Sequence, residues 1–153
     1  MTTSFQEEAS RFGAIGALLG LDLGTKTIGV AVCDPERRVA TPVETVRRKK
    51  FTQDAERLCF LAEERAVTGL VIGLPVNMDG TEGPAAQSAR AFARNFARVS
   101  PLPVAFWDER LSTAAMEREL INLDTSRSKR AEQIDEMAAT YILQGAIDRM
   151  RNF

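Results

Sequence analysis

The stretch ALLGLDLGTKTIGVAV, residues 17–32, decides the fold that the sequence predicts. It consists of two apolar runs joined by a short turn of Gly, Thr and Lys, and one acid, Asp22, lies near the end of the first run. A continuous apolar run is typical of a strand that is buried on both faces in the middle of a sheet. A carboxylate there must be hydrogen-bonded, paired or bound to a metal. Asp22 is therefore either an acceptor for the turn amides or the first member of a site.

The segments that follow predict an α/β fold with a five-stranded mixed sheet. Strands are expected over 17–23, 28–33 and 38–46 as a three-stranded antiparallel meander, and over 69–74 and 101–107 as parallel strands. Helices are expected after residue 50, from Pro84 onward, over 108–120 and over 131–150. Because strand, crossover helix and strand repeat after the meander, helices should cover both faces of the sheet.

Length and composition indicate one globular domain in the cytoplasm. The 153 residues are too few for two lobes of ordinary size. Residues 1 to about 13 lack periodicity and are expected to form either a frayed tail or a short non-catalytic extension. The N-terminal extension is assigned to 1–16 and the domain itself to 17–153. No apolar run of about 18 residues is present, so no membrane span is expected. Cys33 and Cys59 form no CxxC motif and are expected to be free thiols in a reducing compartment.

The residue content excludes several chemistries. The chain has no histidine, which removes histidine general bases, Ser-His and Cys-His nucleophile pairs and His-ligated zinc. The net charge of −1 gives no global positive field, so nucleic acid would have to be bound through local patches. Two basic clusters, 47–50 and 127–130, lie in connecting segments and are either solvated charge or phosphate contacts.

Acidic residues gather where the predicted parallel strands end. Ligands bind beyond the carboxyl ends of such strands. Asp22 lies at the end of the strand expected over 17–23, and Asp108 and Glu109 lie at the end of the strand expected over 101–107. Asp135 lies in the first turns of the last helix. Carboxylates brought together repel one another unless cations bind among them, and oxygen-only ligands suit Mg²⁺ or Mn²⁺. Two such ions are the usual arrangement for phosphodiester hydrolysis. In the alternative, Asp108 caps a helix, and Glu109 and Asp135 are helix-start acids.

Four blocks of the sequence resemble the signature of one known family. They are DLGTKTIGVAV from residue 22, GLPVNMDGTEGP from residue 73, DERLST from residue 108 and DEMAATYILQ from residue 135. In this order they are similar to the YqgF/RuvX family, over about residues 17–148. That family has the RNase H-like fold and is described as Holliday-junction-resolvase-like and as a nuclease of precursor 16S rRNA.

The resemblance implies a metal-dependent nuclease that matures the 5′ end of precursor small-subunit rRNA. The implied catalytic set is Asp22, Asp108, Glu109 and Asp135, in which Asp22, Glu109 and Asp135 bind two Mg²⁺ or Mn²⁺ ions. The expected substrate-binding residues are Thr25, Lys26, Thr27, Asn77 and Arg110. Thr27 stands where the family frequently has Arg. Branched DNA is the alternative substrate, and a homodimer is compatible with the resemblance because resolvase relatives act as dimers.

Two functions of other classes stay open on the sequence alone. An actin-like or sugar-kinase ATPase also begins with a DxGT motif, but it needs a second lobe and a second phosphate loop, for which 153 residues leave no room. A non-catalytic RNA-binding protein with the same fold agrees with the near-neutral net charge. Metal-dependent cleavage of RNA that is lost in an Asp22 variant would separate a nuclease from both.

Overall fold

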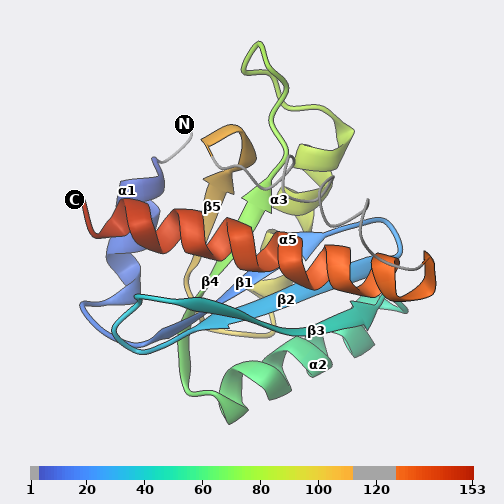
Figure 1. The fold of residues 1–153 in the computed structure, drawn as a ribbon, viewed down its shortest axis with the longest axis horizontal. Helices are drawn as coiled ribbons and strands as arrows, with labels where there is room; N and C mark the ends of the chain where they lie inside the picture. The colour runs from blue at the N-terminus through green and yellow to red at the C-terminus, as the bar shows by residue number, and fades with distance from the viewer. Residues whose placement is uncertain (1–3, 112–126) are drawn as a thin grey trace.

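The computed structural model describes residues 4–111 and 127–153, with the backbone alone for 127–134. The chain forms a five-stranded sheet in the order β3-β2-β1-β4-β5 (Figure 1). Its strands are β1 (Ala17–Leu23), β2 (Thr27–Cys33), β3 (Ala40–Arg47), β4 (Val67–Leu74) and β5 (Val104–Asp108). The first three strands pair antiparallel, and β4 and β5 run parallel to β1. The predicted mixed sheet is confirmed.

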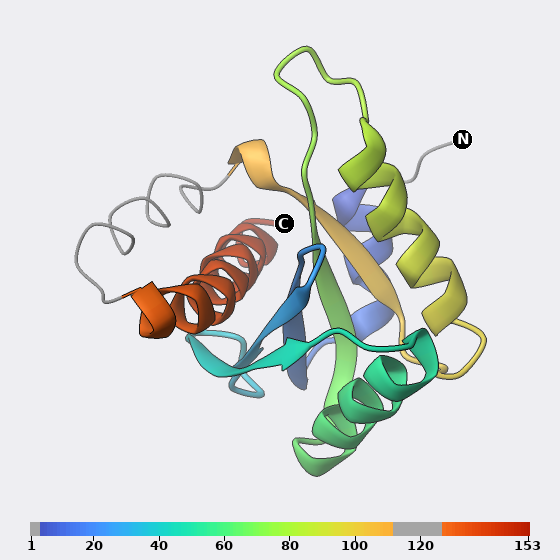
Figure 2. The same ribbon diagram turned by 90° about the vertical axis from the view of Figure 1, so that its right-hand side faces the viewer.

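Helices cover both faces of the sheet, as predicted. Figure 2 shows α5 (Arg127–Met150) on one side and α2 (Phe51–Glu64) and α3 (Pro84–Phe96) on the other. The side chains of β1 alternate between two cores, because successive residues of a strand point to opposite faces. Leu19 and Leu21 pack in the core beneath α2 and α3, whereas Leu18 packs in the core beneath α5. The central position of β1 explains its continuous apolar run.

Helix α5 lies close against the sheet because glycines lie beneath it. A Cβ on Gly29 of β2 would lie 1.9 Å from the carbonyl oxygen of Asp135, and one on Gly73 of β4 would lie 2.5 Å from Cδ1 of Ile142. Gly20 of β1 meets the same helix. Any side chain at these positions would hold the helix away. The glycines therefore set how near Asp135 comes to the end of β1.

The segment before β1 is ordered over residues 4–12, so of the two alternatives left by the sequence it forms a short extension and not a frayed tail. It forms α1 (Phe5–Ala9) and the 3-10 helix η1 (Ser10–Phe12), and Phe12 is buried in the core on the α5 side. Arg37, from the β2–β3 turn, donates a hydrogen bond of 3.1 Å to the carbonyl oxygen of Phe12. These contacts come from distant parts of the chain and leave no local periodicity. The division into 1–16 and 17–153 stays a prediction.

The remaining predictions about the chain concern its middle and its thiols. Residues 109–111 form the 3-10 helix η2 (Glu109–Leu111), and the rest of the helix predicted over 108–120 lies outside the described residues. The side chains of the basic cluster 127–130 also lie outside them. Cys33 and Cys59 are free thiols, as expected. No helix in the described part of the chain combines the length and the apolar character needed to cross a membrane.

Candidate active site

The carboxyl ends of β1, β4 and β5 lie at one edge of the sheet, and Asp22 is the acid of β1 there. It is the next-to-last residue of β1 and pairs with Gly29 of β2. Leu21 pairs with Ile72 in the parallel ladder, so Asp22 lies beside Gly73 of β4 in the register of the two strands. Because Leu21 points into the core beneath α2 and α3, strand alternation directs Asp22 to the face that α5 covers.

The two neighbouring acids at the end of β5 belong to opposite faces. The carboxyl carbon of Glu109 lies 3.3 Å from where a Cβ on Gly73 would stand, on the α5 face. Asp108 follows a residue packed in the core on the α5 side, so it points the other way. It accepts hydrogen bonds from Nη2 of Arg110 at 2.7 Å and from the backbone N–H of Arg110 at 2.9 Å. The Arg110 side chain thereby lowers the pKa of Asp108 below its ordinary value.

Asp135 reaches the same edge from α5. Oγ1 of Thr27, the first residue of β2, donates a hydrogen bond of 2.5 Å to its Oδ2. The carbonyl oxygen of Asp135 lies directly on Gly29, which is the ladder partner of Asp22. Asp22 and Asp135 therefore lie on adjoining parts of one face, and Glu109 approaches that face from β5. The structure brings three of the four predicted acids to one side of the sheet and turns Asp108 away.

The three acids have the donor chemistry of a site for hard divalent cations. Carboxylate oxygens without nitrogen or sulfur suit Mg²⁺ and Mn²⁺. Gly73 lies between Asp22 and Glu109, and a Cβ there would press on the carboxyl group of Glu109. Over the described residues, no three acids or thiols already surround a common point at which they would hold a metal ion. The residues fit the cation by the chemistry of their oxygens and by their shared face.

The turn between β1 and β2 exposes two of the predicted substrate-binding residues, Thr25 and Lys26. It is closed by a hydrogen bond of 2.8 Å from the backbone N–H of Gly24 to the carbonyl oxygen of Thr27. Arg48 holds it from the side. Its backbone N–H donates to the carbonyl oxygen of Lys26 at 2.8 Å, and its Nη1 donates to that of Gly24 at 2.6 Å. These hydrogen bonds fix the conformation of the turn that follows Asp22.

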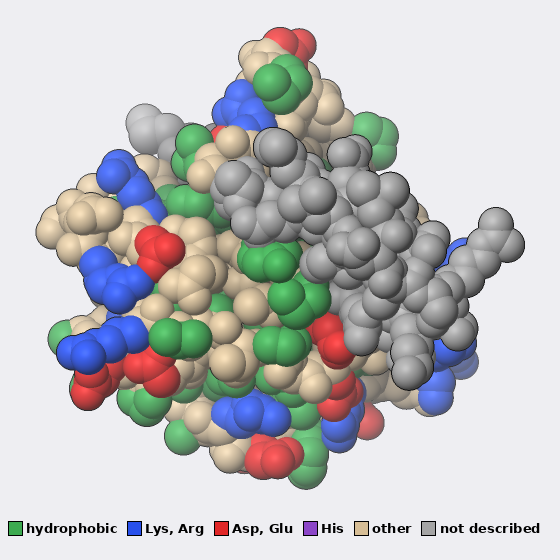
Figure 3. All heavy atoms as spheres, in the orientation of Figure 1, with side chains coloured by type: hydrophobic (Ala, Val, Ile, Leu, Met, Phe, Trp, Pro, Cys, Tyr) green, Lys and Arg blue, Asp and Glu red, His purple; other side chains and the backbone are tan. Residues whose placement is uncertain are grey.

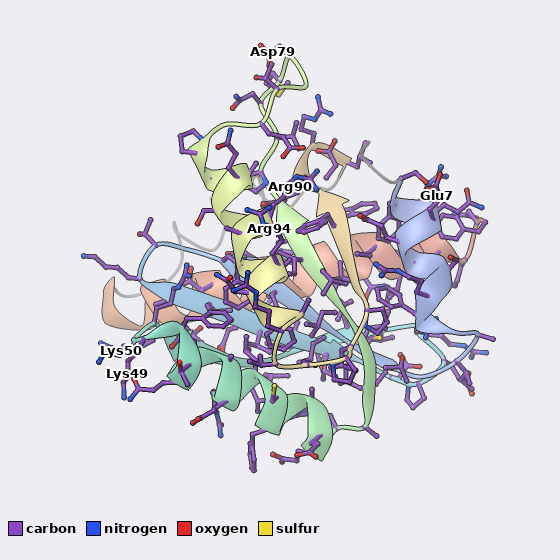
Figure 4. The ribbon with its side chains drawn as sticks, turned by 180° about the vertical axis from the view of Figure 1, so that it is seen from behind. Glu7, Lys49, Lys50, Asp79, Arg90 and Arg94 are labelled. Carbon is purple, nitrogen blue, oxygen red and sulfur yellow. The ribbon has the colours of Figure 1, made fainter. Side chains whose placement is uncertain are left out.

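Asn77 and Arg110 are engaged with the loop that follows β4. Nη1 of Arg110 donates to the carbonyl oxygen of Asn77 at 3.3 Å. Nδ2 of Asn77 donates to Oγ1 of Thr81 at 3.0 Å, and the same hydroxyl donates to Asp79, which lies near the tip of the projecting loop (Figure 4). Both residues fix the shape of this loop. Their contact with substrate stays a prediction.

Two supporting residues were missed by reasoning from the sequence. Gly29 interrupts an apolar strand, and such a glycine signals the close approach of another backbone, so the sequence does carry a sign of it. Arg48 is one of four consecutive bases, and nothing in that run distinguishes the one that folds back onto the turn. Its role appears only when β3 is placed beside β2.

The five-stranded mixed sheet with helices on both faces has the RNase H-like fold. The fold is similar to that of RuvC from Thermus thermophilus in complex with a Holliday junction substrate, with a TM-score of 0.55 and 12% identity over 89% of this chain and 96% of that one. A further structure of RuvC from the same organism gives a TM-score of 0.52 and 13% identity over 88% and 96%. At this identity the likeness shows the fold alone, and it confirms the predicted one.

The chain belongs to the RuvX family. The family pattern, described as "RuvX: Holliday junction resolvase", matches residues 16–149. A protein from Bradyrhizobium diazoefficiens named "Putative pre-16S rRNA nuclease" is 64% identical over 146 residues, which cover 95% of this chain and 91% of that one. One of the same name from Rhodopseudomonas palustris (strain HaA2) is 67% identical over 144 residues, covering 94% and 90%. The resemblance of the four sequence blocks is confirmed, and the chain is a hydrolase of phosphodiester bonds.

Proposed function

We propose that this protein is a divalent-metal-dependent nuclease that matures the 5′ end of precursor 16S rRNA in the cytoplasm. The observation that supports it most is the convergence of Asp22, Glu109 and Asp135 on one face at the carboxyl edge of the sheet. The names of the relatives at 64% and 67% identity support the choice of substrate. The free thiols agree with a reducing compartment.

Three acids would hold the metal ions in this proposal: Asp22, Glu109 and Asp135. When bound, such ions activate water and stabilise the leaving oxygen of a phosphodiester. Thr27 orients the carboxylate of Asp135 through its donated hydrogen bond. Asp108 lies outside the metal-binding set, because it points to the other face and is committed to Arg110.

Residues beside the acids would position the substrate. Lys26 and Thr25 present an ammonium group and a hydroxyl from an exposed turn, where a phosphate can reach both. Thr27 contributes through Asp135 rather than through exposure of its own hydroxyl. Asn77 and Arg110 act on the substrate through the loop whose shape they fix.

The test is cleavage of a precursor 16S rRNA fragment by the purified protein, with and without Mg²⁺ or Mn²⁺. Asp22→Asn and Glu109→Gln should each lower the rate by at least about a hundredfold, since loss of a metal-bound carboxylate removes charge stabilisation of the transition state. Asp108→Asn is the matched control and should retain most of the activity. Undiminished cleavage by Asp22→Asn would overturn the proposal. If Asp108→Asn loses as much activity as Glu109→Gln, Asp108 belongs to the catalytic set after all.

Branched DNA is a second candidate substrate, because the family description names a Holliday junction resolvase. Resolution of a four-way junction needs cuts in two strands, so a DNA substrate of this kind would require two active sites, as in a homodimer. A synthetic junction should be offered to the protein in the same assay, and its mass in solution should be measured by sedimentation. Preferential, symmetric cleavage of the junction by a dimer would favour DNA over rRNA.

A further inference from the structure

We infer that the RNA strand leaves the active edge across the β1–β2 turn and is bound by a basic surface at the start of α2. We call it the α2 basic surface, and it consists of Lys26, Arg47, Lys49 and Lys50. Its partner is the sugar-phosphate backbone of single-stranded RNA that flanks the scissile bond. The inference rests on the proposed function in that the bound strand is the nuclease's substrate.

The α2 basic surface is continuous with the candidate active site through ladder and turn contacts. Arg47 ends β3 and pairs with Thr27 of β2, and Thr27 donates to the carboxylate of Asp135. One residue further on, the backbone N–H of Arg48 donates to the carbonyl oxygen of Lys26. The chain that enters α2 therefore lies against the same turn that follows the acid of β1. A strand that crosses this turn reaches Lys49 and Lys50 next.

Buried and backbone groups hold the segment in place and leave its lysine side chains in solvent. Asp54 is only 3% exposed. Its Oδ1 accepts from the backbone N–H of Lys49 at 2.9 Å, and its own N–H donates to the carbonyl oxygen of Lys50 at 3.1 Å. The guanidinium of Arg48 lies 5.8 Å from the ring centre of Phe92. The side chains of Lys49 and Lys50 are exposed and extend outward near the start of α2 (Figure 4).

Among the residues that the structure describes, neither Lys49 nor Lys50 forms an ion pair. The net charge of the chain is −1, and acidic and basic side chains are interspersed on the visible part of the face in Figure 3. In such a protein, two exposed lysines that form no ion pair among the described residues favour the binding of a phosphate backbone.

A second basic group, Arg90 and Arg94 on α3 (Figure 4), fits an RNA strand less well. Arg90 donates two hydrogen bonds to the carboxylate of Glu82, at 2.6 and 2.7 Å. Its guanidinium also lies 4.8 Å from the ring centre of Phe106. Its charge is therefore already matched, and an incoming phosphate would have to displace Glu82.

The experiment measures RNA binding separately from cleavage. In an Asp22→Asn background, the dissociation constant is measured by fluorescence anisotropy across a salt series, with single-stranded RNA that extends past the cleavage site. Lys49→Ala with Lys50→Ala should weaken binding about tenfold and reduce the slope of log Kd against log salt by about 1.4, since each phosphate contact on a single strand contributes about 0.7. Arg65→Ala with Arg98→Ala is the matched control, because these exposed residues precede β4 and β5 at the opposite edge. Its slope should not change.

Each outcome decides between the inference and the proposed function. An unchanged slope in the lysine variant, an equal loss in both variants, or no RNA binding at all would overturn the inference. If the lysine variant shows the expected loss but the wild-type protein cleaves no RNA, the basic surface stands and the proposed nuclease activity fails. If the wild-type protein cleaves rRNA while the slope is unchanged, the activity stands and the strand follows another path. Thermal unfolding confirms that all variants are folded.

Discussion

Oγ1 of Thr27 and Oδ2 of Asp135 lie 2.5 Å apart and join the first residue of β2 to α5 across 108 positions of sequence. A hydroxyl that donates to a carboxylate forms a charge-assisted hydrogen bond, which is shorter and stronger than a neutral one. This bond is partly buried. Among the contacts described for Asp135, it is the one that fixes the direction of a proposed metal ligand.

Thr27→Val should raise the Mg²⁺ concentration needed for half-maximal cleavage about tenfold. Hydrogen bonds to metal-binding carboxylates typically matter by about 10 to 100-fold in affinity or activity. Valine keeps the branched shape of the side chain and loses the donor. Thr27→Ser keeps the donor and should need the same Mg²⁺ concentration as the wild-type protein. The measurement is a Mg²⁺ titration of the cleavage rate. An unchanged titration in Thr27→Val would show that the bond does not orient Asp135 for metal binding.

Gly29→Ala should destabilise the fold where α5 meets the sheet. The new Cβ would lie 1.9 Å from the carbonyl oxygen of Asp135, so the helix must move outward. We expect the free energy of unfolding to fall by about 1–3 kcal/mol, as for overpacked core positions. Urea unfolding followed by circular dichroism measures this change, and cleavage should fall with it because Asp135 moves.

Gly83→Ala is the matched control for this change. A Cβ at Gly83 would meet Nδ2 of Asn77 at 3.6 Å, an ordinary contact distance. The cost should therefore stay at about 1 kcal/mol or less, which is the usual price of alanine at a helix N-cap. Equal destabilisation by the two variants would show that close packing beneath α5 is not what requires Gly29.

The Arg110–Asp108 pair makes the stability depend on acid pH. Hydrogen bonds from Arg110 hold the pKa of folded Asp108 below its ordinary value of 3.8. The stability that ionised Asp108 contributes is therefore fully present at a pH above its pKa in the unfolded chain. This stability is lost as the pH falls through the lower pKa that Asp108 has in the folded protein. Asp108→Asn should flatten the fall in unfolding free energy from about pH 5 downward. Urea midpoints across a pH series test this, and an unchanged acid slope would contradict it.

The sequence predicted the position of β1 and of Asp22 because the evidence for them is local. An unbroken apolar run indicates a central strand wherever it occurs, and an acid within such a run needs a partner. The choice between Asp108 and Glu109 is different. It depends on where β5 ends and η2 begins, and a shift of one residue exchanges the faces to which the two acids point.

Long-range contacts account for the other differences between prediction and structure. The ordered segment before β1 depends on the packing of Phe12 on Gly69, where a Cβ would lie 2.2 Å from the ring. It also depends on Arg37, which stands 25 residues beyond Phe12. Neither pair of residues is related by a helical or strand period, so no pattern within residues 4–12 predicts these contacts. The same is true of Thr27, whose partner lies on the last helix.

Arg37 is buried to 7% exposure and holds the N-terminal segment against the sheet. It donates to the carbonyl oxygens of Phe12, Gly13 and Gly16 at 3.1, 2.9 and 2.8 Å, and to Oγ1 of Thr68 at 3.3 Å. Burial lowers the pKa of its guanidinium. Its backbone has a φ of +59°, a conformation that only a strong set of contacts keeps in a non-glycine residue.

Arg37→Met should lower the free energy of unfolding by about 3 kcal/mol, because buried carbonyl oxygens left without a donor cost about 1–3 kcal/mol each and some regain water. It should also let a protease cut within residues 4–16 faster than in the wild-type protein. Arg38→Met is the control, since the Arg38 side chain is 71% exposed and pairs with Glu36 at the surface; its effect should stay within about 0.5 kcal/mol. If both variants unfold at the same urea concentration as the wild-type protein, Arg37 does not anchor the segment, and the packing of Phe12 alone must hold it.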